Sequence, residues 1–255
     1  MGQTALITGA SSGIGREVAR IHAERGGDLV VVARSVDKLN ALASELDVSV
    51  TVIGADLAEE GAPQEIYDAV KEAGIEVDLL INNAGFGGRG KFHERDWQLD
   101  RDMIQVNVVA LTALTRLFLP DFVARNRGRI LNVSSTASLM AGPLQAVYYA
   151  TKAYVTSFSN AIAEELHETD VTVTALLPGA TDTGFAETSG MDETSLFENT
   201  FGAREVAQAG YDGMMAGKLD VLAGVTLGQR MLMKSIPITP KSVLLKQIRK
   251  MQEVG

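Results

Sequence analysis

Short apolar segments alternate with longer amphipathic segments along most of this chain of 255 residues, and this alternation limits the folds open to it. Continuous apolar runs are typical of parallel strands that are covered on both faces. We expect strands at residues 4–8, 28–33, 48–53, 77–81, 129–134 and 171–177. We expect helices near residues 14–25, 36–46, 63–73, 101–126 and 148–168. The alternation predicts an α/β fold, a Rossmann-type doubly wound parallel sheet.

The sequence contains no linker, repeat or low-complexity tract that would divide this pattern, and its length suits one α/β domain. We therefore expect a single domain. Residues 1–225 form the dinucleotide-binding body with the catalytic site, and residues 226–255 add a basic helical extension.

Two helical regions, near residues 101–119 and after Val147, are apolar around most of their circumference, which is typical of buried helices. A second buried face on the outside of a sheet favours contact between subunits, hence a homodimer or homotetramer. Burial under the C-terminal segments is the alternative.

The composition argues against several classes of protein. The net charge of −9 argues against a nucleic-acid partner. Without cysteine there is no disulfide or thiolate site, and the three histidines (His22, His93 and His167) lack the spacing of metal ligands. The sequence has no signal peptide, and no run approaches ~20 uninterrupted apolar residues. These features predict a cytoplasmic protein with no metal and no membrane span.

A glycine-rich turn follows the first expected strand directly. Glycine permits a tight turn and a close approach to a ligand, and the helix that follows points free N–H groups at an anion. This position predicts a pyrophosphate site, although the spacing G-x-x-x-G-x-G differs from the common G-x-G-x-x-G. A plain tight connection between a strand and a helix is the alternative. The residues expected at the phosphates are Gly9, Ser11, Ser12, Gly13, Ile14 and Gly15.

The end of the second expected strand indicates which dinucleotide binds. An acid there would accept hydrogen bonds from the ribose hydroxyls of NAD. This chain has Arg34 followed by Ser35, and a guanidinium suits the 2′-phosphate of NADP. We expect NADP(H) as the cofactor; the alternative is that Arg34 is an ordinary exposed arginine.

A tyrosine and a lysine four residues apart indicate chemistry on a carbonyl or an alcohol. Hydride transfer to a carbonyl needs an acid, and the pKa of a free tyrosine, near ~10, is too high for that role at neutral pH. Lys152 shares a helix face with Tyr148, and its ammonium is expected to lower the pKa of Tyr148. Tyr149 has Ala153 at the same spacing. A serine would orient the carbonyl oxygen, and both residues of the adjacent pair Ser134 and Ser135 are candidates.

Several motifs in this order resemble those of the short-chain dehydrogenase/reductase family over nearly the whole chain. The matching segments are Thr8–Gly15 (TGxxxGxG), Asn82–Gly85 (NNAG), Tyr148–Lys152 (YxxxK), and Pro178–Gly179 with Thr183 (PGxxxT). Family spacing selects Ser135, 13 residues before Tyr148, and Asn107, 28 residues before Ser135. From LLPGATDTGF onward the chain is similar to a broad group of bacterial carbonyl reductases. The resemblance implies an oxidoreductase with the catalytic residues Asn107, Ser135, Tyr148 and Lys152.

The resemblance also assigns residues to the cofactor. It implies that Asn107 supports a water chain to Lys152, and that Asn83, Ala84 and Gly85 form a wall beside the adenosine; Asn82 and Asn83 could instead be turn formers. It matches Asp56, with Leu57, to the acid that binds the adenine amino group, a role compatible with capping a helix before Glu59 and Glu60. The remaining cofactor residues it implies are Tyr148, Lys152, Pro178, Gly179, Thr181 and Thr183.

Residues 184–202 mix aromatic residues, methionine, acids and glycines. The family implies a lid over a hydrophobic carbonyl substrate at this position, and a plain surface loop is the alternative. We expect loop 86–95 and residues 139–147 to complete the pocket.

The C-terminal segment 226–255 carries six basic side chains against the single acid Glu253. Thr239 and Pro240 resemble a cap and first residue of a helix, whose apolar face would comprise Leu244, Leu245, Ile248 and Met251. This helix docks on the acidic body, or it contacts an anionic membrane surface or a partner.

The sequence as a whole predicts NADP(H)-dependent interconversion of a carbonyl compound and a secondary alcohol. A second candidate is reduction of 3-oxoacyl thioesters, for which Arg89, Lys91 and Arg95 are basic residues near the pocket mouth. A candidate of another class is a non-catalytic NADP-binding sensor, against which the complete catalytic set argues.

Overall fold

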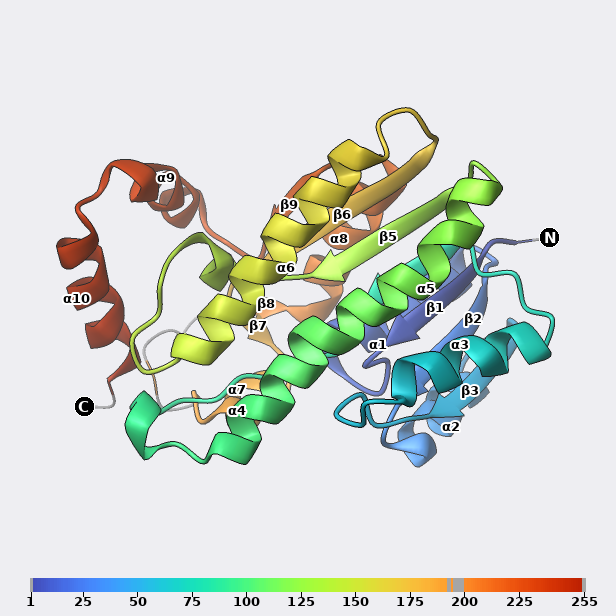
Figure 1. The fold of residues 1–255 in the computed structure, drawn as a ribbon, viewed down its shortest axis with the longest axis horizontal. Helices are drawn as coiled ribbons and strands as arrows, with labels where there is room; N and C mark the ends of the chain where they lie inside the picture. Colours follow the sequence, from blue (N-terminus) through green and yellow to red (C-terminus); the bar gives the residue numbers. More distant parts are fainter. Residues whose placement is uncertain (1, 192–193, 195–199, 254–255) are drawn as a thin grey trace.

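Seven parallel strands form one central sheet in the order β3-β2-β1-β4-β5-β6-β9 (Figure 1). The computed structural model describes residues 2–191, 194 and 200–253. The strands are β1 (Thr4–Thr8), β2 (Asp28–Ala33), β3 (Val50–Gly54), β4 (Leu79–Asn82), β5 (Gly128–Val133), β6 (Val171–Pro178) and β9 (Asp220–Ala223). The winding reverses between β1 and β4, and open α/β sheets bind ligands at such a reversal. The expected doubly wound sheet is confirmed.

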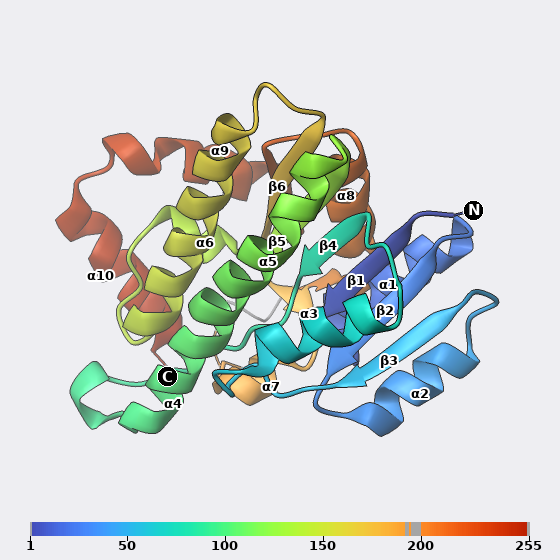
Figure 2. The same ribbon diagram turned by 45° about the vertical axis from the view of Figure 1, so that its right-hand side comes forward.

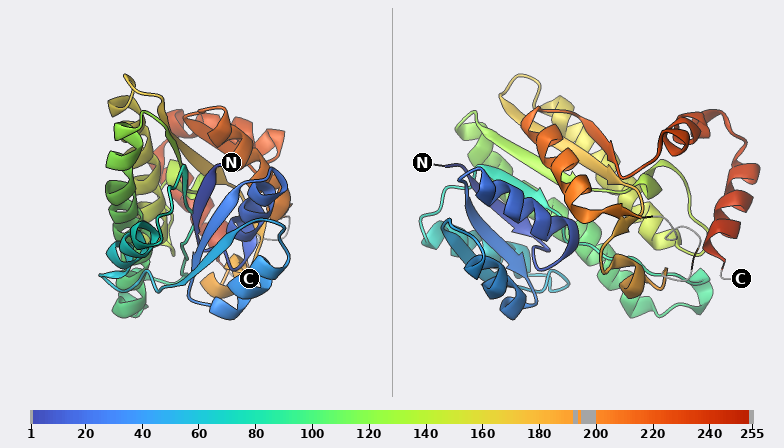
Figure 3. Two further views of the ribbon diagram at one scale, coloured as in Figure 1. Left: turned by 90° about the vertical axis from the view of Figure 1, so that its right-hand side faces the viewer. Right: turned by 180° about the vertical axis from the view of Figure 1, so that it is seen from behind.

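Helices cover both faces of this sheet (Figures 2 and 3). On one face, side chains such as Ile21, Leu39 and Tyr211 form a buried cluster with the strands. On the other face, Ile66, Phe118 and Ile162 belong to a second cluster. The first face carries α1 (Gly13–Glu24), α2 (Val36–Ser44) and α8 (Ala203–Met215), and the second carries α3 (Ala62–Glu72), α5 (Leu111–Ala124) and α6 (Ala146–Glu165). This double cover explains why the strands are apolar throughout.

The expected helix over 101–126 is part of a longer continuous helix. It begins as α4 (Trp97–Ile104), where the Asp96 side chain caps the first turn, passes through a π-helical turn (Gln105–Ala110) and continues as α5. By length and composition, the 28 residues Trp97–Ala124 could cross a membrane, although charged residues interrupt this apolar stretch. In this structure α5 packs along α3, β4 and β5 as a core helix of the α/β domain.

The C-terminal extension forms two helices joined by a short 3-10 turn: α9 (Leu227–Ser235), η5 (Ile236–Ile238) and α10 (Lys241–Gln252). They lie at the end of the molecule opposite β3 and α2 (Figure 1). The expected start of α10 is off by one residue, since Pro240 occupies the capping position and Lys241 begins the helix.

The predicted apolar face of α10 needs a correction. Ile248 and Gln252 are buried and Leu244 packs beside them, whereas Leu245 and Met251 are 37% and 44% exposed. The buried face of α10 therefore consists of Leu244, Ile248 and Gln252, which recur at the i, i+4 spacing of one helix face. Leu245 and Met251 lie outside this face.

Candidate active site

Four candidate catalytic side chains converge near the carboxyl end of β5. Asn107 comes from the π-helical turn, Ser135 follows β5, and Tyr148 and Lys152 lie on the first half of α6. Asn107, Tyr148 and Lys152 are buried. The reversal point of the sheet, between β1 and β4, lies beside them because β4 pairs with β5.

Burial controls the protonation of the tyrosine and the lysine. It raises the pKa of Tyr148 above its ordinary value, and the hydrogen bond with Ser135 is the contact that lowers it. Burial also lowers the pKa of Lys152 to about 8. The Lys152 ammonium donates to the carbonyl oxygen of Val133 at 2.8 Å and lies 5.9 Å from the centroid of the Tyr148 ring. The expected net lowering of the Tyr148 pKa is therefore not found, because desolvation dominates in this geometry.

The two adjacent serines have different surroundings. The Ser134 hydroxyl donates to the carbonyl oxygen of Lys152 at 2.9 Å and hydrogen-bonds with Thr156, so it lies against α6. The Ser135 hydroxyl oxygen accepts from the backbone N–H of Ala137 at 3.1 Å and is hydrogen-bonded to Tyr148. The structure therefore brings Ser135, and not Ser134, to the tyrosine.

Asn107 connects the helix to the loop after β4. Its Nδ2 donates to the Phe86 carbonyl oxygen at 2.9 Å and to Thr151 Oγ1 at 3.1 Å, while its Oδ1 accepts from the Phe86 N–H at 3.1 Å. A Cβ atom at Gly85 would lie 3.0 Å from Asn107 Oδ1 and 3.4 Å from Lys152 Nζ. A side chain at this position would crowd both Asn107 and Lys152. π-helical turns occur frequently at functional sites.

The glycine-rich turn after β1 is braced by Asn83. The Asn83 Nδ2 donates to the carbonyl oxygens of Thr8 and Gly9, at 2.9 and 3.1 Å. A Cβ at Gly15 would lie 2.3 Å from this amide nitrogen, so only glycine fits there. Asn83 thus holds the turn in shape, which is a support that the sequence did not reveal. Ala84 also contributes, through its N–H to the Thr8 hydroxyl.

The turn and the start of α1 fit a phosphate group. Gly9 and Gly13 have φ of 66° and 54°, which favour glycine. Ser12 occupies the capping position of α1, yet in this described part of the chain its side chain makes no capping hydrogen bond. The N-terminal N–H groups of α1, in Gly13, Ile14 and Gly15, are therefore left to an anion.

Arg34 and Asp56 face each other across the ends of β2 and β3. The Arg34 Nη1 lies 3.9 Å from Asp56 Oδ2, and the arginine side chain is 76% exposed. The Asp56 Oδ1 accepts from the N–H of Ala58, but α3 starts only at Ala62. The expected helix cap at Asp56 is therefore wrong, and the carboxylate caps a turn instead. Ser35 occupies the capping position of α2, and Leu57 is buried in the core.

The segment after β6 approaches both ends of the site. Pro178 ends β6, Gly179 follows it, and Thr181 in β7 (Thr181–Asp182) donates to the Gly179 carbonyl oxygen. A Cβ at Gly13 would lie 2.9 Å from the Thr183 methyl carbon, so Thr183 lies on the glycine-rich turn.

The short helix α7 (Phe185–Ser189) lies on the other end of the site. Its first residue, Phe185, packs on Tyr148 with ring centroids 5.3 Å apart. The part of the expected lid at 192–193 and 195–199, Phe197 included, lies outside the described residues.

The C-terminal helix contributes a contact that the sequence analysis missed. Gln252 Nε2 donates to the Tyr149 hydroxyl at 2.9 Å, and the Gln252 carbonyl oxygen accepts from Arg89 Nε at 2.6 Å. Tyr149 in turn packs edge-on against Tyr148, with ring centroids 6.1 Å apart. Burial raises the pKa of Tyr149 to about 12. Gln252 is 103 residues from Tyr149, and no local pattern in the sequence joins them.

The three basic residues predicted near the pocket mouth, Arg89, Lys91 and Arg95, form ion pairs or hydrogen bonds with other residues of the chain. Arg95 pairs with the buried Asp100 at 2.8 Å, and Lys91 pairs with Glu94 at 3.0 Å. Arg89 holds the end of α10 through the Gln252 carbonyl oxygen. They stabilise loop 86–95 and its contact with α10.

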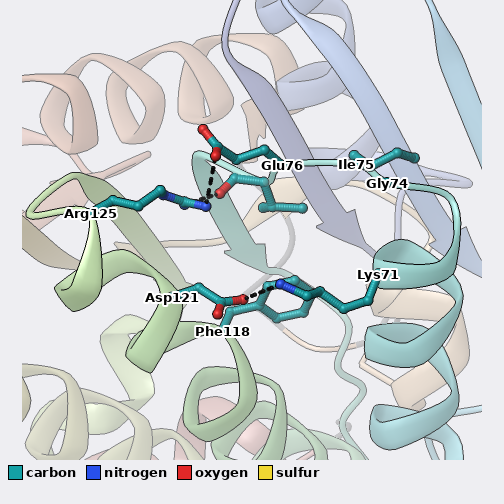
Figure 4. A pocket seen from close by; sticks show the side chains of 8 residues that line it. Lys71, Gly74, Ile75, Glu76, Phe118, Asp121 and Arg125 are labelled. Carbon is teal, nitrogen blue, oxygen red and sulfur yellow. Dashed lines mark hydrogen bonds and ion pairs between the residues drawn. The ribbon is translucent and has the colours of Figure 1, made fainter.

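A cavity of about 200 Å³ lies at the opposite end of the strands, between α3 and α5 (Figure 4). Lys71 and Asp121 pair there at 3.2 Å, and Arg125 pairs with Glu76 at 3.6 Å. These charges neutralise one another, and no candidate catalytic or cofactor residue lines the cavity. The cavity is therefore separate from the candidate active site.

Comparison with known proteins agrees with this geometry. Residues 3–194 match the family model of the short chain dehydrogenases. A short-chain dehydrogenase from Sphingobium yanoikuyae, in complex with NADPH, superposes with a TM-score of 0.82 and 31% identity over 98% of both chains.

Two curated human relatives match a smaller part of the chain. Very-long-chain 3-oxoacyl-CoA reductase is 34% identical over 188 residues, which cover 70% of this chain and 59% of the relative. 17-beta-hydroxysteroid dehydrogenase type 3 is 35% identical over 196 residues, which cover 73% and 62%. The chain thus spans about three-fifths of the length of these relatives.

Proposed function

The chain belongs to the short-chain dehydrogenase family, and from this membership we propose that it interconverts a carbonyl compound and the corresponding secondary alcohol with NADP(H). One observation carries the proposal: Ser135, Tyr148 and Lys152 meet beside Gly85 at the reversal point of the sheet. A hydroxyl pair beside a buried cation is what carbonyl reduction requires.

The residues of the chain supply proton transfer and orientation. The bound cofactor supplies or accepts the hydride. During reduction the Tyr148 hydroxyl donates its proton to the substrate oxygen, and the Ser135 hydroxyl donates a hydrogen bond to the same oxygen. The positive charge of Lys152 stabilises the tyrosinate left behind. Asn107 holds the loop after β4 so that Gly85 stays beside Lys152. Oxidation of the alcohol runs through the same groups in reverse.

The exposed guanidinium of Arg34 supports NADP(H) as the preferred cofactor. Its ion pair with Asp56 is long, at 3.9 Å, so the guanidinium can turn to a 2′-phosphate and form charge-assisted hydrogen bonds. The relative from Sphingobium yanoikuyae was solved with NADPH. We assign the adenosine ribose to the region of Arg34 and Ser35, and the adenine to that of Asp56 and Leu57.

The surroundings of Tyr148 support a hydrophobic substrate. Tyr148 belongs to an apolar cluster with Met103, Tyr149 and Ile248, and Phe185 packs on it. The names of the two human relatives refer to a very-long-chain 3-oxoacyl-CoA and a hydroxysteroid, of which the acyl chain and the ring system are apolar. Reduction of 3-oxoacyl thioesters is the second candidate, although Arg89, Lys91 and Arg95 are already engaged within the chain.

A second subunit is supported by an exposed apolar face. Ile104, Val109 and Tyr154 are each between 36% and 43% exposed, and a groove between Ile104 and Val147 runs beside them. The C-terminal helix reaches Met103 and Tyr149 but leaves this face open. We assign the face to a homo-oligomer that works in the cytoplasm, a reducing compartment that suits a chain without cysteine.

The proposed function is tested by replacing the proton donor. Tyr148→Phe should lower kcat at least a hundredfold, since general acid catalysis contributes roughly 10²–10⁴-fold. NADPH affinity should stay nearly unchanged in a fluorescence titration. The matched variant Tyr149→Phe should retain most of its turnover over a panel of ketones, aldehydes and oxoacyl thioesters. If Tyr149→Phe were the inactive variant, the assignment of Tyr148 would be wrong; an inactive wild type that binds NADPH would favour the sensor.

A further inference from the structure

The C-terminal segment Thr226–Glu253, here called the C-terminal arm, exposes an unusual amount of apolar surface. Four of its large side chains are between 64% and 85% exposed, namely Leu227, Met231, Leu232 and Ile238. Helix α9 has no buried residue. A nine-residue helix has little stability of its own in water. A surface that covers its apolar side chains would stabilise it.

The same arm carries a concentrated positive charge. It holds six cations and no acid before Glu253, and these cations are Arg230, Lys234, Lys241, Lys246, Arg249 and Lys250. Residues 226–255 carry +5 and the remainder −14, which together give the net charge of −9. Arg249 pairs with Glu253 inside the arm, and across the described residues no ion pair joins the arm to the acidic body. The helix α10 does dock on the body, as one of the two expected alternatives, but through packing and hydrogen bonds and not through ion pairs.

The arm is held to the body mainly by one face of α10, and on α9 the Arg230 guanidinium donates to the Leu222 carbonyl oxygen at 3.1 Å. Leu244, Ile248 and Gln252 form this face of α10. Lys246 and Lys250 each follow a residue of this face by two positions, which places them on the opposite side of the helix. Both are exposed, so they point away from the body. On α9, Leu227, Met231 and Lys234 share one exposed face at the i, i+4, i+7 spacing. Cations and large apolar groups are thus presented together to the outside.

We propose that the C-terminal arm is a docking surface for an anionic membrane. Helices that lie in the plane of a membrane interface combine exposed large apolar side chains with lysine and arginine, as this arm does. Protein–protein interfaces are depleted in lysine, which supplies four of the six cations here. The apolar face around Ile104 and Val109, assigned above to a second subunit, lies on other helices and leaves the arm free. Anionic lipid repels the acidic body, and this repulsion orients the molecule with the arm toward the membrane.

Docking of this kind would bring the bilayer close to the substrate side of the site. Gln252 joins the arm to Tyr149, the neighbour of Tyr148. An apolar carbonyl compound that dissolves in the bilayer could then enter beside α10. This consequence rests on the proposed function, whereas the docking itself does not.

Vesicle binding of the purified full-length chain tests the docking without any activity assay. We expect co-sedimentation with vesicles of phosphatidylcholine and phosphatidylglycerol, and little with phosphatidylcholine alone. Each lysine lost should weaken binding about fivefold, so Lys246→Gln with Lys250→Gln should weaken it roughly twenty- to thirtyfold. Leu227→Ser with Met231→Ser should also abolish most binding. The matched control, Lys38→Gln with Lys218→Gln, removes two exposed lysines outside the arm and should bind like the wild type.

Light scattering of the same variants separates the membrane from a second copy of this chain. All four residues changed in the arm are exposed, so the melting temperature should stay unchanged in each variant. Failure of the wild type to bind anionic vesicles would overturn the proposal. It would also be overturned if Leu227→Ser with Met231→Ser left vesicle binding intact but changed the oligomeric state, since the arm would then contact a protein. Loss of turnover with intact vesicle binding would instead count against the proposed function alone.

Discussion

Tyr148 and Lys152 illustrate how burial sets the chemistry of single residues. Burial disfavours the charged form of each group, so it raises the pKa of the phenol and lowers that of the ammonium to about 8. With a pKa of about 8, Lys152 remains mostly protonated at neutral pH. The pair therefore holds a neutral phenol beside a cation, which is the protonation state that carbonyl reduction needs.

At the residue scale, we predict that Arg34 sets the cofactor preference. Arg34→Asp should weaken NADP through repulsion of the 2′-phosphate and should provide an acceptor for the ribose hydroxyls of NAD. A charge-assisted hydrogen bond contributes about 1.5–3 kcal/mol, which corresponds to roughly ten- to a hundredfold discrimination. The measurement is kcat/KM with NADPH and NADH for the wild type and the variant. Residue 12 is serine, not a second basic residue, which limits the preference to a moderate one.

A matched control keeps this prediction specific. Lys218→Asp makes the same change of net charge at an exposed position after α8, and it should leave the ratio of the two cofactors unchanged. A wild type that prefers NADH, or an Arg34→Asp variant with an unchanged ratio, would show that Arg34 is only a surface arginine.

At the scale of elements, the contact between α10 and α6 reaches the candidate site, because Tyr149 packs on Tyr148. Gln252→Ala should raise KM for a bulky ketone more than it lowers kcat, because it leaves the buried Tyr149 hydroxyl without its donor and loosens the wall beside Tyr148. An unsatisfied buried polar group costs about 1–3 kcal/mol, so the arm should also become more sensitive to limited proteolysis. Gln247→Ala, on the exposed side of the same helix, is the control.

A double-mutant cycle distinguishes this contact from general damage. Tyr149→Phe removes the acceptor of the same hydrogen bond, so the double variant should be little worse than Gln252→Ala alone. Fully additive effects on KM would mean that the two side chains act independently.

The elements themselves differ in how well a sequence predicts them. β1 and β2 match the expected residues 4–8 and 28–33, because continuous apolar runs specify buried parallel strands. α8 was not predicted, since Gly210 and Gly213 lower its helix propensity. The structure explains both glycines: a Cβ would lie 2.6 Å from Leu176 and 2.2 Å from Val221, so α8 can pack closely on the sheet only with glycine.

The candidate site also has parts that the sequence predicts and parts that it does not. The sequence and the family resemblance together locate the glycine-rich turn and the Tyr148 and Lys152 pair, since both depend on local spacing. They could not reveal the π-helical turn that carries Asn107, nor the contact of Gln252 with Tyr149. The second of these features joins segments that lie 103 residues apart along the chain.

At the scale of the whole molecule, charge and apolar surface are separated. The acidic body carries the sheet and the site, while the basic arm lies at one end (Figure 1). The apolar face around Ile104, Val109 and Tyr154 lies on α4, α6 and the π-helical turn, on different helices from those of the arm. Two distinct apolar surfaces fit the two contacts proposed above, one between subunits and one with the membrane.

The subunit contact can be tested independently of the arm. Light scattering at micromolar concentration should show a dimer or tetramer, because stable interfaces bury about 800 Å² on each partner and an extended helical face can supply that area. Ile104→Glu with Val109→Glu should give a smaller species, since each new carboxylate would be buried at the contact without a partner. Both positions are partly exposed in a single chain, so the monomer should still fold and bind NADPH. Leu219→Glu, at an exposed apolar position outside this face, should leave the oligomer unchanged. A monomeric wild type would contradict the subunit contact and leave the fold and the site untouched.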